Sequence, residues 1–256
     1  MTIDSLDNST PVSGQSAINV KSVAENSLPY RIIHRHEDFW VLEKQAGAPM
    51  HTRQGSPGLL RQLSRNFPWQ RFWPVHRLDS VTSGLLLVAR NKEAAARFGE
   101  MFARHQIDKY YLAISDRKPT RKQGTVEGDM ARSRRGGWKL CHSRNKPAIT
   151  QFKSSAMGEG KRLFLLHPLT GKTHQLRVAM KSLGAPIVGD MRYHAVAQAQ
   201  QADRCYLHAY GLSFLWHGET CQFVLPPSDG ALFSGAELPA LLAPWAQPRD
   251  LSWPKV

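Results

Sequence analysis

Residues 76–89 read HRLDSVTSGLLLVA, and they place an acidic residue, Asp79, close to Arg77 and just ahead of an apolar run. The run at residues 85–89 is short, continuous and preceded by turn-forming residues, which predicts a buried strand. A carboxylate on the turn before such a strand lies at the rim of a sheet, and a neighbouring arginine keeps it ionised. An ionised, rigidly held carboxylate suits a nucleophile, so we interpret Asp79 as the candidate catalytic residue. The alternative is that Asp79 only caps a turn, because residues 80–84 supply ordinary turn chemistry.

A second informative block lies further along the chain, with LTGKTHQLRV at residues 169–178, then PIVGD at residues 186–190 and Tyr193. We predict a helix that Thr173 caps and Gly184 ends. Its expected buried stripe consists of Leu176, Ala179, Met180 and Leu183. Arg177 would lie in the first turn, where the helix dipole disfavours a cation, so it requires a nearby anion such as Asp79 or a phosphate group. The alternative is that Arg177 is ordinary surface charge.

The chain is strongly basic, with a formal net charge of +14 and a pI near 10.0 over 256 residues. A polyanion is the natural partner of such a protein, because lysine and arginine replace its condensed counterions. The charge is also uneven. Residues 117–146 hold ten Lys or Arg against two acidic residues, a net of +8. We predict that this stretch faces the polyanion, and the alternative is a solvated charge run that serves solubility.

The sequence argues against a membrane protein, a secreted protein and a metalloprotein. The sequence contains no run of about 18 apolar residues, so we expect no membrane-spanning helix. The N-terminal residues MTIDSLD have neither the basic start nor the apolar segment of a secretory signal. Cys141, Cys205 and Cys221 are widely spaced without a C-x-x-C pair, which favours a reducing cytoplasm and no structural zinc. The eleven histidines show no tight ligand spacing, so we expect no metal.

Hydrophobic periodicity divides the chain into a tail and one domain. Residues 1–28 are rich in Ser, Asn, Thr and Gly without a sustained period, so we expect a flexible N-terminal tail. A helix capped by Asn91 is expected over residues 91–106, with Ala95, Phe98 and Phe102 on one face. Strands are expected at residues 32–33, 39–42, 110–114, 125–126, 139–141, 148–153, 162–167, 206–216 and 222–225. This pattern predicts an α+β fold with a largely antiparallel mixed sheet and flanking helices, and we expect residues 226–256 to wrap its core.

Both blocks resemble motifs of one family, the RNA pseudouridine synthases of the RluA type. Members carry an H-R-L-D-x-x-T-S-G-L-L-L block with the catalytic aspartate, then a T-G-R-T-H-Q-(I/L)-R block and a P-(I/L)-x-G-D-x-x-Y block. Shorter matches follow in family order: FWVLEKQAG at residues 39–47, KYYLA at residues 109–113 and LHA at residues 207–209. The resemblance implies that residues 29–256 form one catalytic domain with a central basic cleft. The separate N-terminal RNA-binding domain of many relatives is not expected, because the tail is too short for one.

The resemblance also implies catalytic roles. It makes Asp79 the catalytic carboxylate and Arg177 the partner that keeps it ionised at neutral pH. Tyr110 and Tyr111 are neighbours in an expected strand and must face opposite sides of it. The K-x-Y spacing from Lys109 selects Tyr111, which in relatives stacks on the target uracil and is a candidate for helping to remove the proton from C5. The alternative is that both tyrosines merely pack.

RNA contacts are implied for a second set of residues, namely His76, Arg77, Lys109, Lys172 and His174. By resemblance, Arg77 fills the gap left by a flipped base or holds a phosphate. Lys172 stands where most relatives have arginine. This departure keeps the charge but loses the bidentate fork, which weakens a phosphate contact.

The implied activity is isomerisation of specific uridines to pseudouridine in transfer or ribosomal RNA, without a cofactor or a metal. We expect the protein to act as a monomer in the cytoplasm. One alternative is a non-catalytic RNA-binding or chaperone protein on the same scaffold. Another is a hydrolytic enzyme that uses Asp79 as a general acid or base, although hydrolysis usually requires a second carboxylate or a metal.

Overall fold

The computed structural model describes residues 28–52, 57–133 and 136–255. The expected flexible tail, residues 1–28, lies outside these ranges except for its last residue, so that expectation stays a prediction. Among the helices of the described ranges, none is long and apolar enough to span a bilayer.

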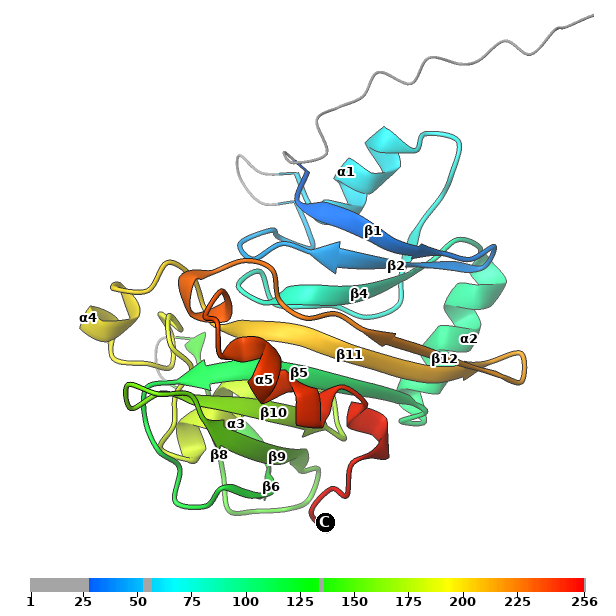
Figure 1. Ribbon diagram of the computed structural model, residues 1–256. Helices are drawn as coiled ribbons and strands as arrows, with labels where there is room; N and C mark the ends of the chain where they lie inside the picture. The colour runs from blue at the N-terminus through cyan, green and yellow to red at the C-terminus, as the bar shows by residue number, and fades with distance from the viewer. Residues whose placement is uncertain (1–27, 53–56, 134–135, 256) are drawn as a thin grey trace, which may run out of the picture.

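A mixed sheet forms the centre of the protein (Figure 1). Its strands are β1 (Tyr30–Arg35), β2 (Phe39–Lys44), β3 (Trp73–Pro74), β4 (Ser83–Ala89), β5 (Ile107–Ser115), β6 (Gln123–Gly128), β9 (Ala148–Ala156), β10 (Arg162–Pro168), β11 (Leu207–Trp216) and β12 (Glu219–Val224). The order across the sheet is β1-β2-β4-β11-β5-β10-β9-β6, with β3 against β4 and β12 against β11. Strands β4 and β11 pair in parallel, and the other pairs within the described ranges are antiparallel. The expected largely antiparallel mixed sheet is therefore confirmed, and every expected strand overlaps an observed one.

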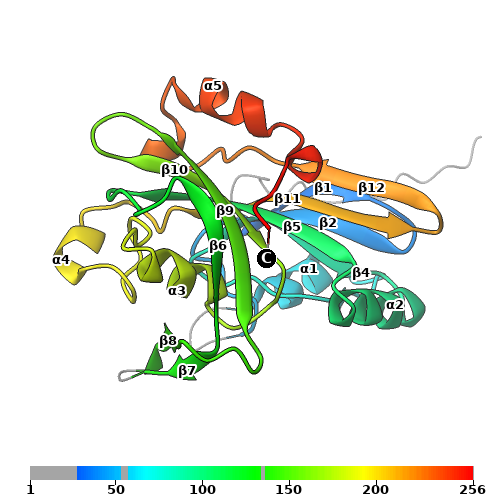
Figure 2. The same cartoon turned by 90° about the horizontal axis from the view of Figure 1, so that it is seen from below.

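Helices flank the sheet on both sides. They are α1 (Leu59–Asn66), α2 (Lys92–Ala103), α3 (Gln175–Ser182), α4 (Val196–Ala199) and α5 (Leu238–Leu242). A separate hairpin consists of β7 (Met130–Arg132) and β8 (Trp138–Leu140), and short 3-10 helices lie at Ala231–Phe233, Ala243–Trp245 and Pro248–Asp250. Figure 2 shows α1, α2, α3 and this hairpin on one side of the sheet, with α5 on the other.

Helix α2 begins as the sequence predicts, because the Asn91 side chain accepts a hydrogen bond from the Ala94 backbone N–H at 2.7 Å. Its fully buried face is shifted by one residue from the expected one. Ala94, Phe98 and Met101 are buried, whereas Phe102 is only half-buried and turns towards a cavity described below. The helical period was predicted correctly, and the tertiary contacts set the rotation.

Two hydrophobic clusters hold the layers together. One contains Phe39 and Leu86 of neighbouring strands and packs against α1 and α2. The other is centred on β5 and β10 and includes Leu238 and Trp245 from the C-terminal segment. Burial of these two side chains confirms that the segment after Pro226 wraps the core.

Gly84 allows the parallel approach of β4 to β11. It has a φ of +103°, and a Cβ at this position would lie 2.3 Å from the backbone oxygen of Ala209. A side chain would therefore force the two strands apart directly behind the loop that carries Asp79. Only glycine meets both the conformational and the steric requirement here.

We predict that Gly84→Ala lowers the free energy of unfolding by about 2–5 kcal/mol, because it adds a steric clash to an unfavourable φ. Gly218→Ala is the matched control, since Gly218 has a φ of +89° but open space around the added Cβ. Urea unfolding followed by circular dichroism measures both variants. Equal losses in the two variants would contradict the argument from close approach.

Candidate active site

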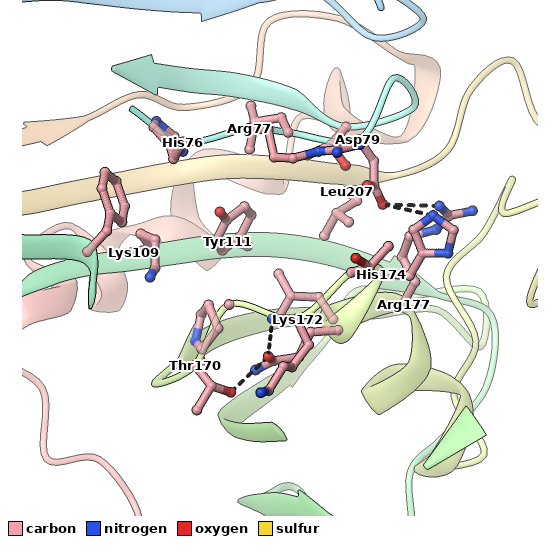
Figure 3. Close-up of a pocket in the computed structure, with 18 of the residues that line it drawn as sticks. His76, Arg77, Asp79, Lys109, Tyr111, Thr170, Lys172, His174, Arg177 and Leu207 are labelled. Atoms are coloured by element: carbon pink, nitrogen blue, oxygen red, sulfur yellow. Dashed lines mark hydrogen bonds and ion pairs between the residues drawn. The ribbon is translucent and has the colours of Figure 1, made fainter. Parts of the chain in front are cut away.

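A cavity of about 510 Å³ opens between the loop before β4 and the segment that leads into α3 (Figure 3). All eight residues singled out from the sequence line it: His76, Arg77, Asp79, Lys109, Tyr111, Lys172, His174 and Arg177. Apolar side chains such as Leu176 and Leu207 complete its walls. The expected central basic cleft therefore corresponds to an observed cavity.

Asp79 lies on a turn between β3 and β4, closed by a hydrogen bond from the Thr82 N–H to the Asp79 carbonyl at 3.1 Å. Its side chain is 20% exposed, and Oδ2 accepts a hydrogen bond from Nη1 of Arg177 at 3.1 Å. Asp79 therefore lies on a turn, as expected if it only capped that turn. The carboxylate nevertheless points into the cavity and keeps room for a ligand (Figure 3).

Arg177 is buried and binds two carboxylates. Its Nε and Nη2 donate to Asp190 at 2.8 Å and 2.7 Å, and its Nη1 donates to Asp79. Burial works to lower the pKa of Arg177, but the hydrogen bonds and charge of Asp190 together with the charge of Asp79 outweigh it and raise that pKa. The expectation that Arg177 meets Asp79 is confirmed, and the surface-charge alternative is wrong. Asp190 was quoted from the sequence without a role, and it is the stronger partner.

Lys44 is a residue of the site whose role the sequence did not disclose. Its side chain is fully buried, and Nζ donates to the backbone oxygens of Gln45, Ser80 and Thr82 at 2.8, 3.0 and 2.7 Å. Burial lowers the pKa of Lys44 to about 7, and the charge of Arg204 acts in the same direction while that of Asp79 opposes it. The bonds to Ser80 and Thr82 tie the Asp79 turn to the end of β2. The available signal was a lysine two residues after the apolar run at residues 39–42.

Tyr111 and Tyr110 face opposite sides of β5, as expected. Tyr111 lines the cavity, whereas Tyr110 stacks with Trp253 at a centroid distance of 5.8 Å. Burial, assisted by the negative charge of Asp79, raises the pKa of Tyr111. Its hydroxyl is therefore protonated at neutral pH and can donate a hydrogen bond to a ligand in the cavity.

His76 and Lys109 form one wall of the cavity. Nε2 of His76 accepts the Leu87 backbone N–H at 2.8 Å, and its ring stacks on Phe102. Burial and the charge of Lys109 lower the pKa of His76 to about 3, so its ring is neutral. His76 therefore holds the segment beside β4 and brings no positive charge to RNA. Burial also lowers the pKa of Lys109, whereas Arg77 is exposed and carries its charge at the cavity rim.

The start of α3 differs from the prediction. The helix begins at Gln175, its N-cap is His174, and no side chain caps it, so Thr173 as the cap is wrong. Instead, Oε1 of Gln175 accepts hydrogen bonds from the Lys172 N–H at 2.9 Å and from the Thr170 hydroxyl at 2.8 Å. These bonds fold the preceding loop back on the helix. His174 takes a left-handed conformation with a φ of +57°, and Lys172 is exposed.

The His174 side chain lies between those of Asp79 and Tyr193. Its Nε2 is 4.0 Å from Oδ2 of Asp79, and its Nδ1 is 2.8 Å from the Tyr193 hydroxyl. That hydroxyl accepts the Trp138 backbone N–H at 3.0 Å and can donate its own proton to Nδ1, which leaves the hydrogen on Nε2 facing Asp79. Burial lowers the pKa of His174, against the opposing charge of Asp79. His174 thus contacts the candidate catalytic carboxylate, a position that a role in RNA binding alone does not explain.

The groups in the cavity that can take part in a reaction are one carboxylate, several cationic side chains and a phenol. Among the described residues that line it, Asp79 is the one acidic side chain. Within the described ranges, the group of side chains spaced to hold a metal ion is His36, Glu37 and Asp38 at the β1–β2 turn, outside the cavity. The arrangement suits a reaction on an anionic ligand that one fixed carboxylate promotes.

Comparison with known proteins identifies the same family as the sequence motifs do. The model of the RNA pseudouridylate synthase family matches residues 38–182. An RNA pseudouridine synthase of Haemophilus influenzae is 46% identical over 199 residues, which cover 78% of this chain and 88% of that protein. The dual-specificity RNA pseudouridine synthase RluA of Salmonella typhi is 30% identical over 76% of this chain and 92% of its own length. Human RNA pseudouridylate synthase domain containing 1 has a similar structure, with a TM-score of 0.66, 31% identity and coverage of 77% of this chain and 83% of that one.

The chain belongs to the RluA-type RNA pseudouridine synthase family. Its fold is that of the pseudouridylate synthase domain, and its activity is the isomerisation of uridine to pseudouridine in RNA.

Two neutral histidines, the partly buried His76 and the fully buried His208, give this enzyme an acid sensitivity that can be measured. Burial lowers the pKa of His76 to about 3 and that of His208 to about 4, whereas both titrate near 6.5 in the unfolded chain. The unfolded state therefore binds more protons below pH 6.5, and stability falls as the pH drops from 6.5 towards 4. Each histidine contributes about 1.4 kcal/mol per pH unit over this range. We predict that His76→Gln, which retains an acceptor for the Leu87 N–H, reduces the slope by one proton.

Urea unfolding at a series of pH values checks this prediction, and His217→Gln is the control because that side chain is 62% exposed. Parallel stability curves for His76→Gln and the wild-type protein would contradict the assignment of His76 as a neutral ring.

Proposed function

We propose that Asp79 is the catalytic carboxylate of this synthase and that its substrate is a uridine extruded from transfer or ribosomal RNA. The observation that supports this proposal is the contact between Arg177 and Asp79 in a cavity that Tyr111 also lines. The carboxylate is fixed by a partner that remains charged, while one side of it stays open to a ligand. The Salmonella typhi relative is named a dual-specificity enzyme, which is compatible with substrates of more than one RNA class.

The proposed reaction needs no net addition or removal of atoms. The bond from C1′ to N1 breaks, the uracil turns within the cavity, and C5 forms a new bond to C1′. The C5 proton passes to a base, and N1 ends with a proton. Asp79 assists the first step by attack on the sugar, by attack on the ring or by promoting elimination to a glycal. In each route, the carboxylate must be ionised and in contact with the nucleoside, and neither a metal nor a cofactor is required.

The other site residues receive positioning roles. Tyr111 stacks on the uracil and, as a protonated phenol, can donate to a ring carbonyl or to a water. A role as a base for the C5 proton would require it to lose its own proton first, and its raised pKa opposes that loss. Arg77 at the rim and Lys172 on the loop before α3 contact backbone phosphates, and Lys109 contributes positive charge to the cavity wall. Residues 117–133 and 136–146 extend the basic surface, and we expect the enzyme to work as a monomer in the cytoplasm.

The two rival functions have less support. A hydrolase would need a second carboxylate near Asp79, but Asp190 is fully buried and both of its oxygens bind Arg177. A purely RNA-binding protein would have no need of a carboxylate, which repels phosphate, inside a basic cavity. Product analysis separates the three functions, because isomerised RNA, free base and unchanged RNA are distinct outcomes.

We predict that Asp79→Asn lowers turnover by at least about a thousandfold, a barrier increase of roughly 4 kcal/mol. The reason is that the amide carries no charge and is a poor nucleophile. Pseudouridine mapping of total transfer and ribosomal RNA from cells that carry the wild-type, deleted or Asp79→Asn gene identifies the substrate and tests the residue together. Loss of the same sites in both mutants is the expected result.

Glu159→Gln is the control for the loss of one negative charge, because this side chain is 86% exposed on the β9–β10 turn. An Asp79→Asn enzyme that folds and still converts the mapped uridine at near wild-type rate would overturn the assignment.

A further inference from the structure

A second cavity lies beside the first and shares a wall with it. Its volume is about 570 Å³, and residues 171–173 line both cavities. The opposite wall comes from the β7–β8 hairpin and the turn that follows it. Figure 2 shows this hairpin on the same side of the sheet as α3. Because residues 171–173 line both cavities, an RNA strand that leaves the first cavity past Lys172 can enter the second.

The lining of this second cavity suits a nucleotide. Trp138 offers an aromatic surface, one side of which carries the Arg132 guanidinium at 5.2 Å. Lys146 and Lys172 supply positive charge, and the Asn145 side chain supplies an amide. A base stacks on an aromatic ring irrespective of its sequence, and lysines bind a phosphate as point charges. The size of the cavity also lies within the range of small-ligand sites.

The cavity contains one carboxylate, Asp129, and its oxygens are already engaged. The backbone N–H groups of Asn145 and Lys146 donate to them at 3.0 and 2.8 Å. A hydrogen bond from the Ser143 side chain, followed by these two backbone bonds, lowers the pKa of Asp129. This carboxylate therefore organises the turn that presents Lys146. The remaining charge on the lining is positive.

We propose that the second cavity is the subsite for the nucleotide adjacent to the target uridine, whose base stacks on Trp138 and whose phosphate lies between Lys146 and Lys172. The inference rests on the proposed function, because it takes the first cavity to hold the target. The preference is for single-stranded or unstacked RNA, since a paired nucleotide cannot present its face to the indole.

The subsite is also connected to Asp79. The backbone N–H of Trp138 donates to the Tyr193 hydroxyl, which contacts His174, and His174 faces Asp79. The residue that stacks on the neighbouring base is thus three contacts from the catalytic carboxylate. Occupancy of the subsite fixes the hairpin strand that orients this chain of contacts.

The first test measures binding and needs no turnover. The probe is a short fluorescein-labelled oligouridylate, and its affinity is followed by fluorescence anisotropy at fixed salt. Trp138→Ala is expected to weaken binding by about 5- to 150-fold, the range for loss of one stacked base. Trp138→Phe restores most of it. Trp69→Ala is the control, because Trp69 is 71% exposed between α1 and β3, away from both cavities, and binds the probe as the wild-type protein does. Wild-type affinity in Trp138→Ala would overturn the subsite.

The second test identifies the nucleotide. An RNA hairpin that contains the mapped uridine is made with an abasic nucleotide at each flanking position in turn. The kcat/KM on these RNAs is measured for the wild-type enzyme and for Trp138→Ala. At one flanking position, the abasic residue and the mutation are expected to lower kcat/KM by similar factors that do not multiply when combined. Multiplicative losses at both positions would overturn the proposal. Failure of the wild-type enzyme on the intact hairpin would instead count against the proposed function, while the oligouridylate result still decides the subsite.

Discussion

The burial of one guanidinium, that of Arg177, is the constraint on which the site depends. A buried cation without partners costs several kcal/mol, so the fold must supply carboxylates to this position. Asp190 supplies two hydrogen bonds and is itself fully buried, and Asp79 supplies the third. Because Asp190 alone can hold Arg177 in place, Asp79 can turn its oxygens to a substrate without releasing the cation. The site thus separates the carboxylate that anchors Arg177 from the carboxylate that is free to react.

A buried lysine, Lys44, fixes the backbone of the same turn. Lys44 donates to the carbonyls of Ser80 and Thr82, and the Ser80 carbonyl also accepts the Gly47 backbone N–H at 2.8 Å. Unpaired buried carbonyls are costly, so this lysine and the turn require one another. Arg177 holds the side chain of Asp79 and Lys44 holds its backbone. Such preorganisation reduces the rearrangement needed when charge develops during the reaction.

The sequence predicted those parts of the fold that depend on local pattern. The apolar run at residues 85–89 became the buried strand β4, and Asn91 capped α2, because periodicity and capping act over a few residues. The motif blocks also identified the residues of the cavity. Helix α1 was not predicted, since it is short and begins after Gly58 without a side-chain cap. Its stability comes from Leu59 and Leu63, which are buried against the sheet.

Two features of the site could not be predicted because their causes are distant in sequence. Burial of Lys44 depends on carbonyls that lie 36 and 38 residues further along the chain. The start of α3 failed as a prediction for a related reason. Thr173 is a residue type that often caps helices. Here, however, Oε1 of Gln175 accepts the Lys172 N–H, and Nε2 of Gln175 donates to the carbonyl of Ile149 on β9. The contact with a neighbouring strand determines where this helix begins. A capping rule that considers only nearby residues cannot predict such a contact.

The same attachment explains the unusual backbone of His174. A left-handed conformation costs a non-glycine residue about 1–2 kcal/mol, so it persists only where surrounding contacts offset that cost. Gln175 fixes the loop on one side, and the Tyr193 hydroxyl fixes the imidazole on the other. In this conformation Nε2 lies 4.0 Å from Oδ2 of Asp79. The strain at His174 is therefore coupled to the position of the carboxylate, and the contact from Trp138 to Tyr193 ties both to the basic hairpin. The cavity and the β7–β8 hairpin are thus linked through this one residue.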